Sequence, residues 1–502
     1  MSPQLANILL LHPRPTPGDS CTVPYSCLAV AAPLVAAGHG VQILDEFSTP
    51  NYERELIAAA SRADLAGISC FTGFQIDSAL RTARLLRQHV PQLPLVWGGY
   101  HPSLYPETTV ASEFADFVIT GQGEWTFLDF VNRFAAQESV DSTPGVWRKV
   151  NGVPTRNPAA ADAFRGLEDF PPFPFHLVSL SSFLIDSLTP KSISYHSSLG
   201  CPFRCNFCAV TQIYEQRWSG FPAERVLRDV RYLVESTGAH SVEFYDNNFF
   251  VNDQRTCEIA RGLAAAQLGI TWSGEARPDT IAEYDDEMLG LLTRSGLRWV
   301  FIGAESGHDT VLQMMERDHN VADILRAAEK LSRNKIKATF SFNIGYPGEP
   351  PDNFKRTEAL CRELLRMNRD TELMIYVTTA YDSTPSFHRA QEFASKTTSA
   401  IDDWSHLDQR SGNGKTWLSA EYSRKLFNFS ITTFYATSFL HRRLRLQFPR
   451  NVFLRLLHGV ANLRLRFGRY RTILDLRILN KLFLLISGKT RRQPVEMWSG
   501  RS

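Results

Sequence analysis

Three closely spaced cysteines are the residues in this sequence best suited to do chemistry. They lie in the segment Gly-Cys-Pro-Phe-Arg-Cys-Asn-Phe-Cys, at Cys201, Cys205 and Cys208. Three thiolates in this C-x3-C-x2-C spacing can hold three irons of a [4Fe–4S] cluster and leave the fourth iron open for a ligand. The alternatives are a zinc site or three buried thiols. A structural zinc ion takes four ligands, and no fourth cysteine lies close in the sequence, so the spacing favours the cluster.

The cysteine segment stands inside a long run of alternating strands and helices. Between residue 191 and about residue 390, six strand-like segments are each followed by a helix-like segment. The first of them, Ser-Ile-Ser-Tyr-His-Ser-Ser, leads directly into the cysteines. This order predicts a parallel barrel, partial or complete, which places its chemistry in the loops that follow the strands.

Polar residues follow the later strands of this run. Asp246, Asn247 and Asn248 end the second strand, and further polar side chains end the next three, namely Glu275, Arg277, Glu305 and Asn343. Each could instead be a helix cap or part of a surface ion pair. Because the carboxyl ends of parallel strands meet at one end of a barrel, their joint occurrence favours a binding site.

The cysteine spacing, with Phe207 before the last cysteine, resembles the signature of the radical S-adenosylmethionine (SAM) superfamily. The resemblance implies a partial (β/α)6 barrel in which the open iron binds SAM. It also implies reductive cleavage of SAM to a 5′-deoxyadenosyl radical that takes hydrogen from an unactivated carbon. An external electron donor such as flavodoxin or ferredoxin is implied too. By this analogy SAM contacts Phe207, Asp246, Asn247, Arg277, Glu305 and Asn343.

Residues 1–138 form an earlier unit of alternating short apolar strands and amphipathic helices. This alternation predicts a Rossmann-like, doubly wound parallel sheet with its ligand crevice at the carboxyl ends of the strands. Gly98 and Gly99 end one strand, and Gly121 and Gly123 precede a helix. Paired glycines allow a bulky ligand to approach the backbone, although tight turns explain them equally well.

Joined to such a barrel, this unit resembles the cobalamin-binding domain of B12-dependent radical SAM proteins. The whole chain is similar to the group that contains the anaerobic magnesium-protoporphyrin ester cyclase and several methyltransferases. The Asp-x-His-x-x-Gly motif that supplies an axial histidine in other cobalamin proteins is absent. The resemblance assigns cobalamin binding to Ser69, Phe71, Thr72, Gly98, Gly99, Tyr100, His101, Gly121, Gly123 and Glu124.

Two further segments complete the predicted domain organisation. Residues 139–190 are a connector that contains a hairpin with an Asn-Gly turn. Residues 391–502 are mainly helical and basic: from residue 441 onward there are 15 Lys and Arg against 2 Asp and Glu. Three interpretations of this basic tail stay open, in falling order of preference. They are a cap on the barrel, docking to a membrane surface, and binding to nucleic acid.

The sequence predicts a cytoplasmic protein, because it has no basic leader before its first apolar run and no long apolar span. Membrane docking would place it at the inner membrane surface and would suit a lipophilic small-molecule substrate. The favoured function is cobalamin-dependent methylation of an unactivated carbon. The alternative is a radical SAM oxidoreductase or cyclase of the same architecture. A sensor without turnover is disfavoured, because it needs no open iron.

Overall fold

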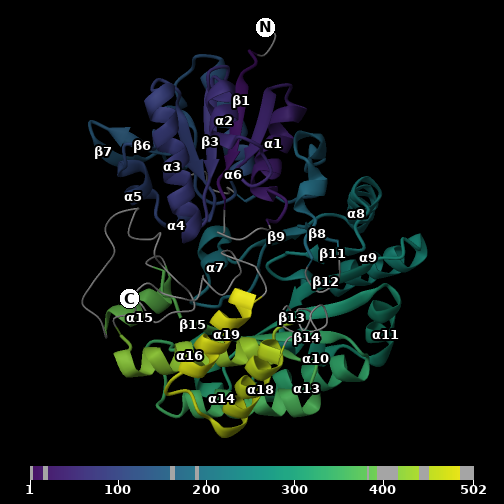
Figure 1. The fold of residues 1–502 in the computed structure, drawn as a ribbon. Coiled ribbons are helices and arrows are strands. Elements are labelled where there is room, and N and C mark those ends of the chain that lie inside the picture. The colour runs from purple at the N-terminus through teal and green to yellow at the C-terminus, as the bar shows by residue number, and fades with distance from the viewer. Residues whose placement is uncertain are drawn as a thin grey trace.

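The computed structural model describes residues 4–14, 21–158, 164–186, 191–381, 384–392, 417–439 and 452–486. Two large sheets form the body of the molecule, one from the N-terminal part and one from the middle of the chain (Figure 1). A helical C-terminal part lies against the second sheet. The predicted α/β fold class, with its two parallel sheets and its helical end, is therefore confirmed.

The first sheet has the strand order β2-β1-β3-β4-β5-β6-β7, and its first five strands are parallel. The order 2-1-3-4-5 is that of a doubly wound sheet, with a switch point between β1 and β3. Its parallel strands are β1 (Asn7–His12), β2 (Gly40–Asp45), β3 (Leu65–Ser69), β4 (Leu95–Gly98) and β5 (Phe117–Val118). Its helices are α1 (Tyr25–Ala36), α2 (Tyr52–Ala60), α3 (Phe74–His89), α4 (Tyr100–Leu104), α5 (Pro106–Ala111) and α6 (Gly123–Ala135).

Both faces of this sheet are buried. Along β1, Ile8 and Leu10 pack into one apolar core, whereas Leu9 and Leu11 pack into the other. Successive strand side chains point to opposite faces, so a continuous apolar run such as this one fits a sheet covered by helices on both sides.

The hairpin predicted in the connector is present, and it extends the first sheet. Strands β6 (Trp147–Val150) and β7 (Val153–Arg156) pair antiparallel with each other, and β6 pairs antiparallel with β5. At the turn, Asn151 has φ 52° and Gly152 has φ 81°. Two positive φ angles are typical of the tight hairpin turn that Asn-Gly favours.

The second sheet contains the six predicted strands, all parallel, in the order β15-β14-β13-β12-β11-β8. In the described residues β8 and β15 do not pair, so the sheet is open, as in a partial barrel. Its strands are β8 (Ser192–Tyr195), β11 (Ser241–Phe244), β12 (Thr271–Ala276), β13 (Leu297–Glu305), β14 (Lys337–Ile344) and β15 (Glu372–Val377).

Helices connect these strands, and a small hairpin holds the cysteines. Strands β9 (Ser198–Gly200) and β10 (Trp218–Gly220) pair antiparallel on either side of the cysteine loop, residues 201–208, and of helix α7 (Ala209–Tyr214). The other helices are α8 (Ala223–Thr237), α9 (Asp253–Ala266), α10 (Pro278–Glu283), α11 (Asp286–Arg294), α12 (Asp309–Met314), α13 (Val321–Arg333), α14 (Asn353–Met367) and α15 (Pro385–Gln391).

In the described residues, three C-terminal helices follow the second sheet, and the first of them covers its open edge at β15. They are α16 (Ala420–Thr437), α18 (Val452–Phe467) and α19 (Leu474–Ile486) (Figure 1). Ser430 Oγ of α16 donates a 2.8 Å hydrogen bond to the carbonyl of Ile375 in β15. An edge strand otherwise leaves such backbone groups unpaired, so α16 protects this edge.

No helix of the described ranges is both long and apolar enough to span a bilayer. The predicted basic tail lies partly outside the described residues, since 440–451 and 487–502 are not among them.

Candidate functional site

A cavity of about 630 Å³ lies between the two sheets and has walls from both. The first sheet contributes residues at the carboxyl ends of β1, β3 and β4, together with the start of α6. The second sheet contributes residues that follow β8 and β11, the end of β12, and parts of the cysteine hairpin. Both crevices that the strand order predicts therefore open into one space.

Most of the residues that the sequence assigned to cobalamin line this cavity. They are Ser69, Phe71, Gly98, Gly99, Tyr100, Gly121, Gly123 and Glu124. Aromatic side chains supplied by the second sheet's domain face the same space, namely Tyr214, Phe221 and Tyr245.

Two predicted cobalamin residues, Thr72 and His101, are not among the residues that line the cavity, and their contact with cobalamin stays a prediction. Their side chains face each other, with His101 Nδ1 3.3 Å from Thr72 Oγ1. His101 is fully buried, and its ring lies 5.1 Å from the ring of Tyr105. Burial lowers the pKa of His101 to about 3. His101 is therefore a neutral packing residue in the structure.

The cavity wall fits a large ligand that comes close to the backbone. Gly99 has φ 97°, and a Cβ there would lie 2.8 Å from the carbonyl oxygen of Cys70. Glu124 Oε2 is buried without a hydrogen-bond partner among the described residues, and burial raises the pKa of Glu124 to about 7. An unpaired buried acceptor suits the amide N–H groups at the rim of a corrin ring, because burying it unpaired is costly. These residues fit cobalamin.

The cysteine loop is shaped by local backbone bonds. Gly200 has φ 75°, and a Cβ there would lie 2.1 Å from the carbonyl oxygen of Arg217, so this position requires glycine. The backbone N–H of Cys201 donates to that same carbonyl at 3.0 Å. The N–H of Cys208 donates to the carbonyl of Cys205 at 3.1 Å, just before α7 begins.

Two of the three thiols, Cys201 and Cys208, are hard to ionise because they are buried. Burial, reinforced by neighbouring Cys205, raises the pKa of Cys208 to about 12, and burial also raises the pKa of Cys201. Bound iron would offset the cost of ionising these buried thiols, because metal binding displaces the thiol protons. Within the described ranges, the three sulfurs do not form a group close enough to hold a single ion. The preference for a cluster over zinc therefore rests on the spacing of the three cysteines in the sequence.

Arg317 is a site residue that the sequence did not reveal. Its Nη1 donates to Cys205 Sγ at 3.0 Å, and its Nη2 donates to the carbonyl of Gly303 at 2.8 Å. Arg317 Nη2 also lies 3.7 Å from a carboxylate oxygen of Glu305. The residue follows α12 in a turn, so no strand-end pattern indicated it.

Asp246, which was assigned to SAM, holds the cysteine hairpin instead of facing an open site. It is fully buried, and its carboxylate accepts hydrogen bonds from the backbone and hydroxyl of Ser197 at 2.7 and 2.6 Å. It also accepts one from the Ser198 hydroxyl at 2.7 Å. A direct contact between Asp246 and SAM stays a prediction, and the structure gives this carboxylate a positioning role.

The two asparagines after Asp246 differ in their surroundings. Asn247 lines the cavity, and its Oδ1 accepts a 3.2 Å hydrogen bond from the Tyr100 hydroxyl. Asn248 is buried, and neither atom of its carboxamide has a partner in the described part of the chain. Such a group suggests a missing ligand, and its place beside Asp246 and Asn247 was the only sequence signal for it.

Arg277 and Glu305 lie close to the cysteine loop. The guanidinium of Arg277 stacks on the ring of Phe203 at 3.8 Å and pairs with Asp279 at 2.7 Å, while its Nη1 has no partner among the described residues. Two of its three nitrogens, Nε and Nη2, are thus occupied by Asp279. Glu305 has φ 62° at a register shift in β13, and burial raises its pKa. A non-glycine residue at positive φ marks strain that is common at functional sites.

Phe207 and Asn343 are the two remaining residues that the sequence assigned to SAM. Phe207 packs against a small apolar cluster of Val311, Met315 and Tyr346 beneath the cysteine loop. Asn343 is half-buried, is the second-last residue of β14, and is in register with Tyr376 of β15. Contacts of both residues with SAM stay predictions.

Two family models match the chain in the places that the geometry indicates. Residues 19–131 match the B12 binding domain, and residues 195–361 match the radical SAM superfamily.

Sequence relatives cover most of the chain. An uncharacterized methyltransferase of Pyrococcus horikoshii is 25% identical over 68% of this chain and 74% of its own length. The anaerobic magnesium-protoporphyrin IX monomethyl ester cyclase of a Synechocystis strain is 24% identical over 74% of each chain. The hopanoid C-3 methylase of Methylococcus capsulatus is 23% identical over 76% of this chain and 72% of its own length.

Two solved structures share the fold. The cobalamin-dependent SAM radical enzyme OxsB, with aqua-cobalamin and SAM bound, gives a TM-score of 0.71 at 16% identity, over 97% of this chain and 76% of that one. The radical SAM methyltransferase TsrM of Kitasatospora setae, with cobalamin and a [4Fe-4S] cluster bound, gives a TM-score of 0.63 at 17% identity. The match covers 77% of this chain and 75% of that one.

Proposed function

We propose that this chain, a radical SAM protein that carries a B12-binding domain, is a cobalamin-dependent methyltransferase acting on an unactivated carbon. The radical SAM domain implies a [4Fe–4S] cluster and SAM, and the B12-binding domain implies cobalamin. The observation that supports the proposal best is the single cavity that both domains line, because methyl transfer requires the two cofactors to reach one substrate.

When bound, the cluster with SAM supplies a 5′-deoxyadenosyl radical, and cobalamin supplies a methyl group. The protein's own residues hold and shield these groups. Cys201, Cys205 and Cys208 are the proposed iron ligands, and Arg317 donates to Cys205. The aromatic walls of the cavity exclude water, which protects a radical from side reactions.

The second candidate is a cyclase or oxidoreductase of the same architecture, since one relative is named an ester cyclase. Methyl transfer is preferred because the other two relatives described above are named as a methyltransferase and a methylase. Reconstitution under anaerobic conditions with SAM, cobalamin and a reductant distinguishes the two. The methyltransferase should form S-adenosylhomocysteine together with 5′-deoxyadenosine. 5′-Deoxyadenosine alone would reject methyl transfer, and unchanged product formation by Cys201→Ala would reject the radical SAM assignment.

The substrate in this proposal is a lipophilic small molecule, and the C-terminal helices dock to a membrane surface. On α18 and α19, six large apolar side chains are 48 to 65% exposed: Val452, Leu456, Leu463, Phe467, Leu474 and Ile478. Basic side chains are exposed among them, including Arg466, Arg471, Arg477 and Lys481. An apolar surface interleaved with cations suits the anionic inner surface of the cytoplasmic membrane. A flavodoxin or ferredoxin is the proposed electron donor.

Co-sedimentation with vesicles tests this docking. The full chain should bind vesicles that contain anionic lipid, and Phe467→Ser combined with Leu474→Ser should reduce the bound fraction severalfold. Val153→Ser, which changes a 62% exposed apolar residue in the β6–β7 hairpin, should have no effect. Equal binding by all three proteins, or binding to duplex DNA in place of vesicles, would reject the membrane interpretation.

A further inference from the structure

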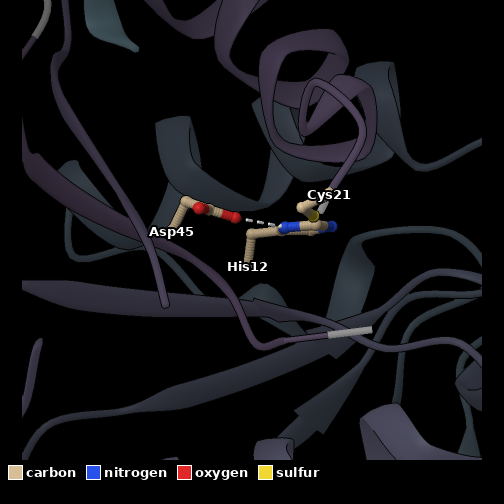
Figure 2. Close-up of side chains that lie close together, drawn as sticks. All are labelled: His12, Cys21 and Asp45. Carbon is tan, nitrogen blue, oxygen red and sulfur yellow. Dashed lines mark hydrogen bonds and ion pairs between the residues drawn. The ribbon is translucent and has the colours of Figure 1, made fainter. Parts of the chain in front are cut away.

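A second group of metal-ligating side chains lies in the first domain, apart from the cysteine loop. His12 ends β1, Asp45 ends β2, and Cys21 lies a few residues before α1 (Figure 2). Their donor atoms all lie within 4.8 Å of one another, and no other group of three His, Cys, Asp or Glu in the described residues meets this criterion. All three residues are buried: His12 is 8% exposed, Cys21 5% and Asp45 2%.

The contacts of the group orient its donors toward each other. His12 Nδ1 lies 2.7 Å from Asp45 Oδ2, and the backbone N–H of Ser48 donates to Asp45 Oδ1 at 2.7 Å. Asp45 is therefore anchored by its other oxygen. In Figure 2 the Cys21 sulfur lies beside the imidazole ring of His12. A buried carboxylate, imidazole and thiol of this kind are costly to bury together unless something links them.

We propose that His12, Cys21 and Asp45 bind one Zn²⁺ ion. A thiolate disfavours Mg²⁺ and Ca²⁺, whereas one sulfur, one nitrogen and one oxygen donor match the ligand types of zinc. Zinc bonds of about 2.0–2.3 Å in a tetrahedron place donors about 3.3–3.6 Å apart. The donors here need to move only by about 1 Å to reach that spacing, with water as the fourth ligand.

The ion holds the segment before α1 in place. His12 lines the cavity, but Cys21 and Asp45 do not, so the ion lies behind the cavity wall. The segment that Cys21 begins contacts the second sheet at two points. The N–H of Val23 donates to Ser194 Oγ at 3.1 Å, and the Tyr25 hydroxyl donates to the Ser194 carbonyl at 3.1 Å. A metal bond at Cys21 therefore fixes a segment that joins the two domains.

Elemental analysis of the full chain with its cluster assembled tests the proposal. After equilibration with Zn²⁺ and gel filtration, the wild type should retain about one Zn²⁺ per chain, and Cys21→Ser and His12→Gln should lose most of it. The bound iron should not change. Cys257→Ser, which alters a half-buried cysteine on α9, serves as the matched control and should retain zinc. A wild type without zinc, or equal zinc in Cys21→Ser, would overturn the proposal.

X-ray absorption at the zinc edge gives a second readout that requires no variant. The expected shell is one sulfur at about 2.3 Å with nitrogen and oxygen ligands at about 2.0–2.2 Å. Three sulfurs around the ion would instead place zinc on the cysteine loop and overturn the proposal. Neither measurement depends on methyl transfer. A failure of the zinc proposal can therefore be told apart from a failure of the methyltransferase proposal.

Discussion

The Tyr100 hydroxyl of the B12-binding domain donates a 3.2 Å hydrogen bond to Asn247 Oδ1 of the radical SAM domain, in the wall of the shared cavity. Burial, with a contribution from Cys208, raises the pKa of Tyr100 above the ordinary tyrosine value. This bond connects a residue beside the glycine pair of one domain to a strand end of the other. It is therefore a direct contact between the two predicted cofactor sites.

Tyr100→Phe should weaken cobalamin binding without unfolding the protein. A neutral hydrogen bond contributes about 1 kcal/mol net, so the dissociation constant for hydroxocobalamin should rise about fivefold. Fluorescence quenching of the full chain measures this constant. Tyr232→Phe, at a 46% exposed tyrosine on α8, is the control and should bind like the wild type. Equal constants for Tyr100→Phe and the wild type would show that the bond does not support the cofactor site.

Arg317→Gln should make the cluster harder to reduce. Arg317 Nη1 lies 3.0 Å from Cys205 Sγ, and a cationic donor to a ligand sulfur stabilises the more negative, reduced cluster. The reduction potential should fall by several tens of millivolts, since 59 mV corresponds to about 1.4 kcal/mol for one electron.

A redox titration followed by electron paramagnetic resonance measures this potential. Arg317→Lys should restore part of the shift because it keeps the charge. Arg326→Gln, at an exposed ion pair on α13, should leave the potential unchanged. An unaltered potential in Arg317→Gln would contradict the role assigned to the bond.

Glu275→Gln should stabilise the protein at alkaline pH. Glu275 lines the cavity, and burial, with a contribution from Asp246, raises the pKa of Glu275 to about 8. The folded state then binds a proton that the unfolded state releases above about pH 4.5. Stability is therefore lost as the pH rises from about 4.5 to about 8, and the glutamine variant avoids that loss.

The melting temperature across this range tests the prediction. Glu275→Gln should melt several degrees above the wild type at pH 8.5 and close to it at pH 4. Glu283→Gln, the same change at a glutamate on α10, is the control. A constant difference between Glu275→Gln and the wild type at all pH values would refute the titration of Glu275.

Gly99→Ala should destabilise the B12-binding domain and reduce its cobalamin content. The alanine would adopt φ 97° and place its Cβ 2.8 Å from the Cys70 carbonyl oxygen. We expect a loss of about 2–4 kcal/mol, the sum of backbone strain and overlap.

Gly152→Ala separates these two causes. Its φ is 81°, but nothing lies within 4 Å of the added Cβ, so only the backbone strain of about 1–2 kcal/mol applies. Chemical denaturation and the visible absorbance of bound cobalamin measure both effects. If Gly152→Ala were as damaging as Gly99→Ala, close packing at Gly99 would not be the cause.

Much of the fold follows from local pattern. The run of four buried apolar residues in β1 and the amphipathic helices between strands were sufficient to predict two parallel sheets, whereas the order of the strands within each sheet came from the tertiary structure. The Asn-Gly turn was sufficient to predict the β6–β7 hairpin. Periodicity and turn chemistry act over a few residues, so they can be read without knowing what each element packs against.

The candidate site was only partly predictable, for a physical reason. The cysteine spacing indicates a cluster because its ligands lie within eight residues, and the glycine pair indicates a close backbone approach. Which polar side chains remain open to a ligand depends on partners far away in the chain. Asp246 is taken up by Ser197 and Ser198, whereas Asn248 beside it has no partner among the described residues.

The same contrast between local pattern and long-range contact applies to the remaining features of this protein. Short-range spacing and periodicity determined the chemistry of the cysteine loop and the parallel sheets that carry it. Folding in three dimensions placed Arg317 on Cys205, paired His101 with Thr72, and brought Cys21 to the ends of β1 and β2 beside His12 and Asp45. Each of these contacts joins residues well separated in the chain, and their energies depend on burial and on distances that no local pattern records.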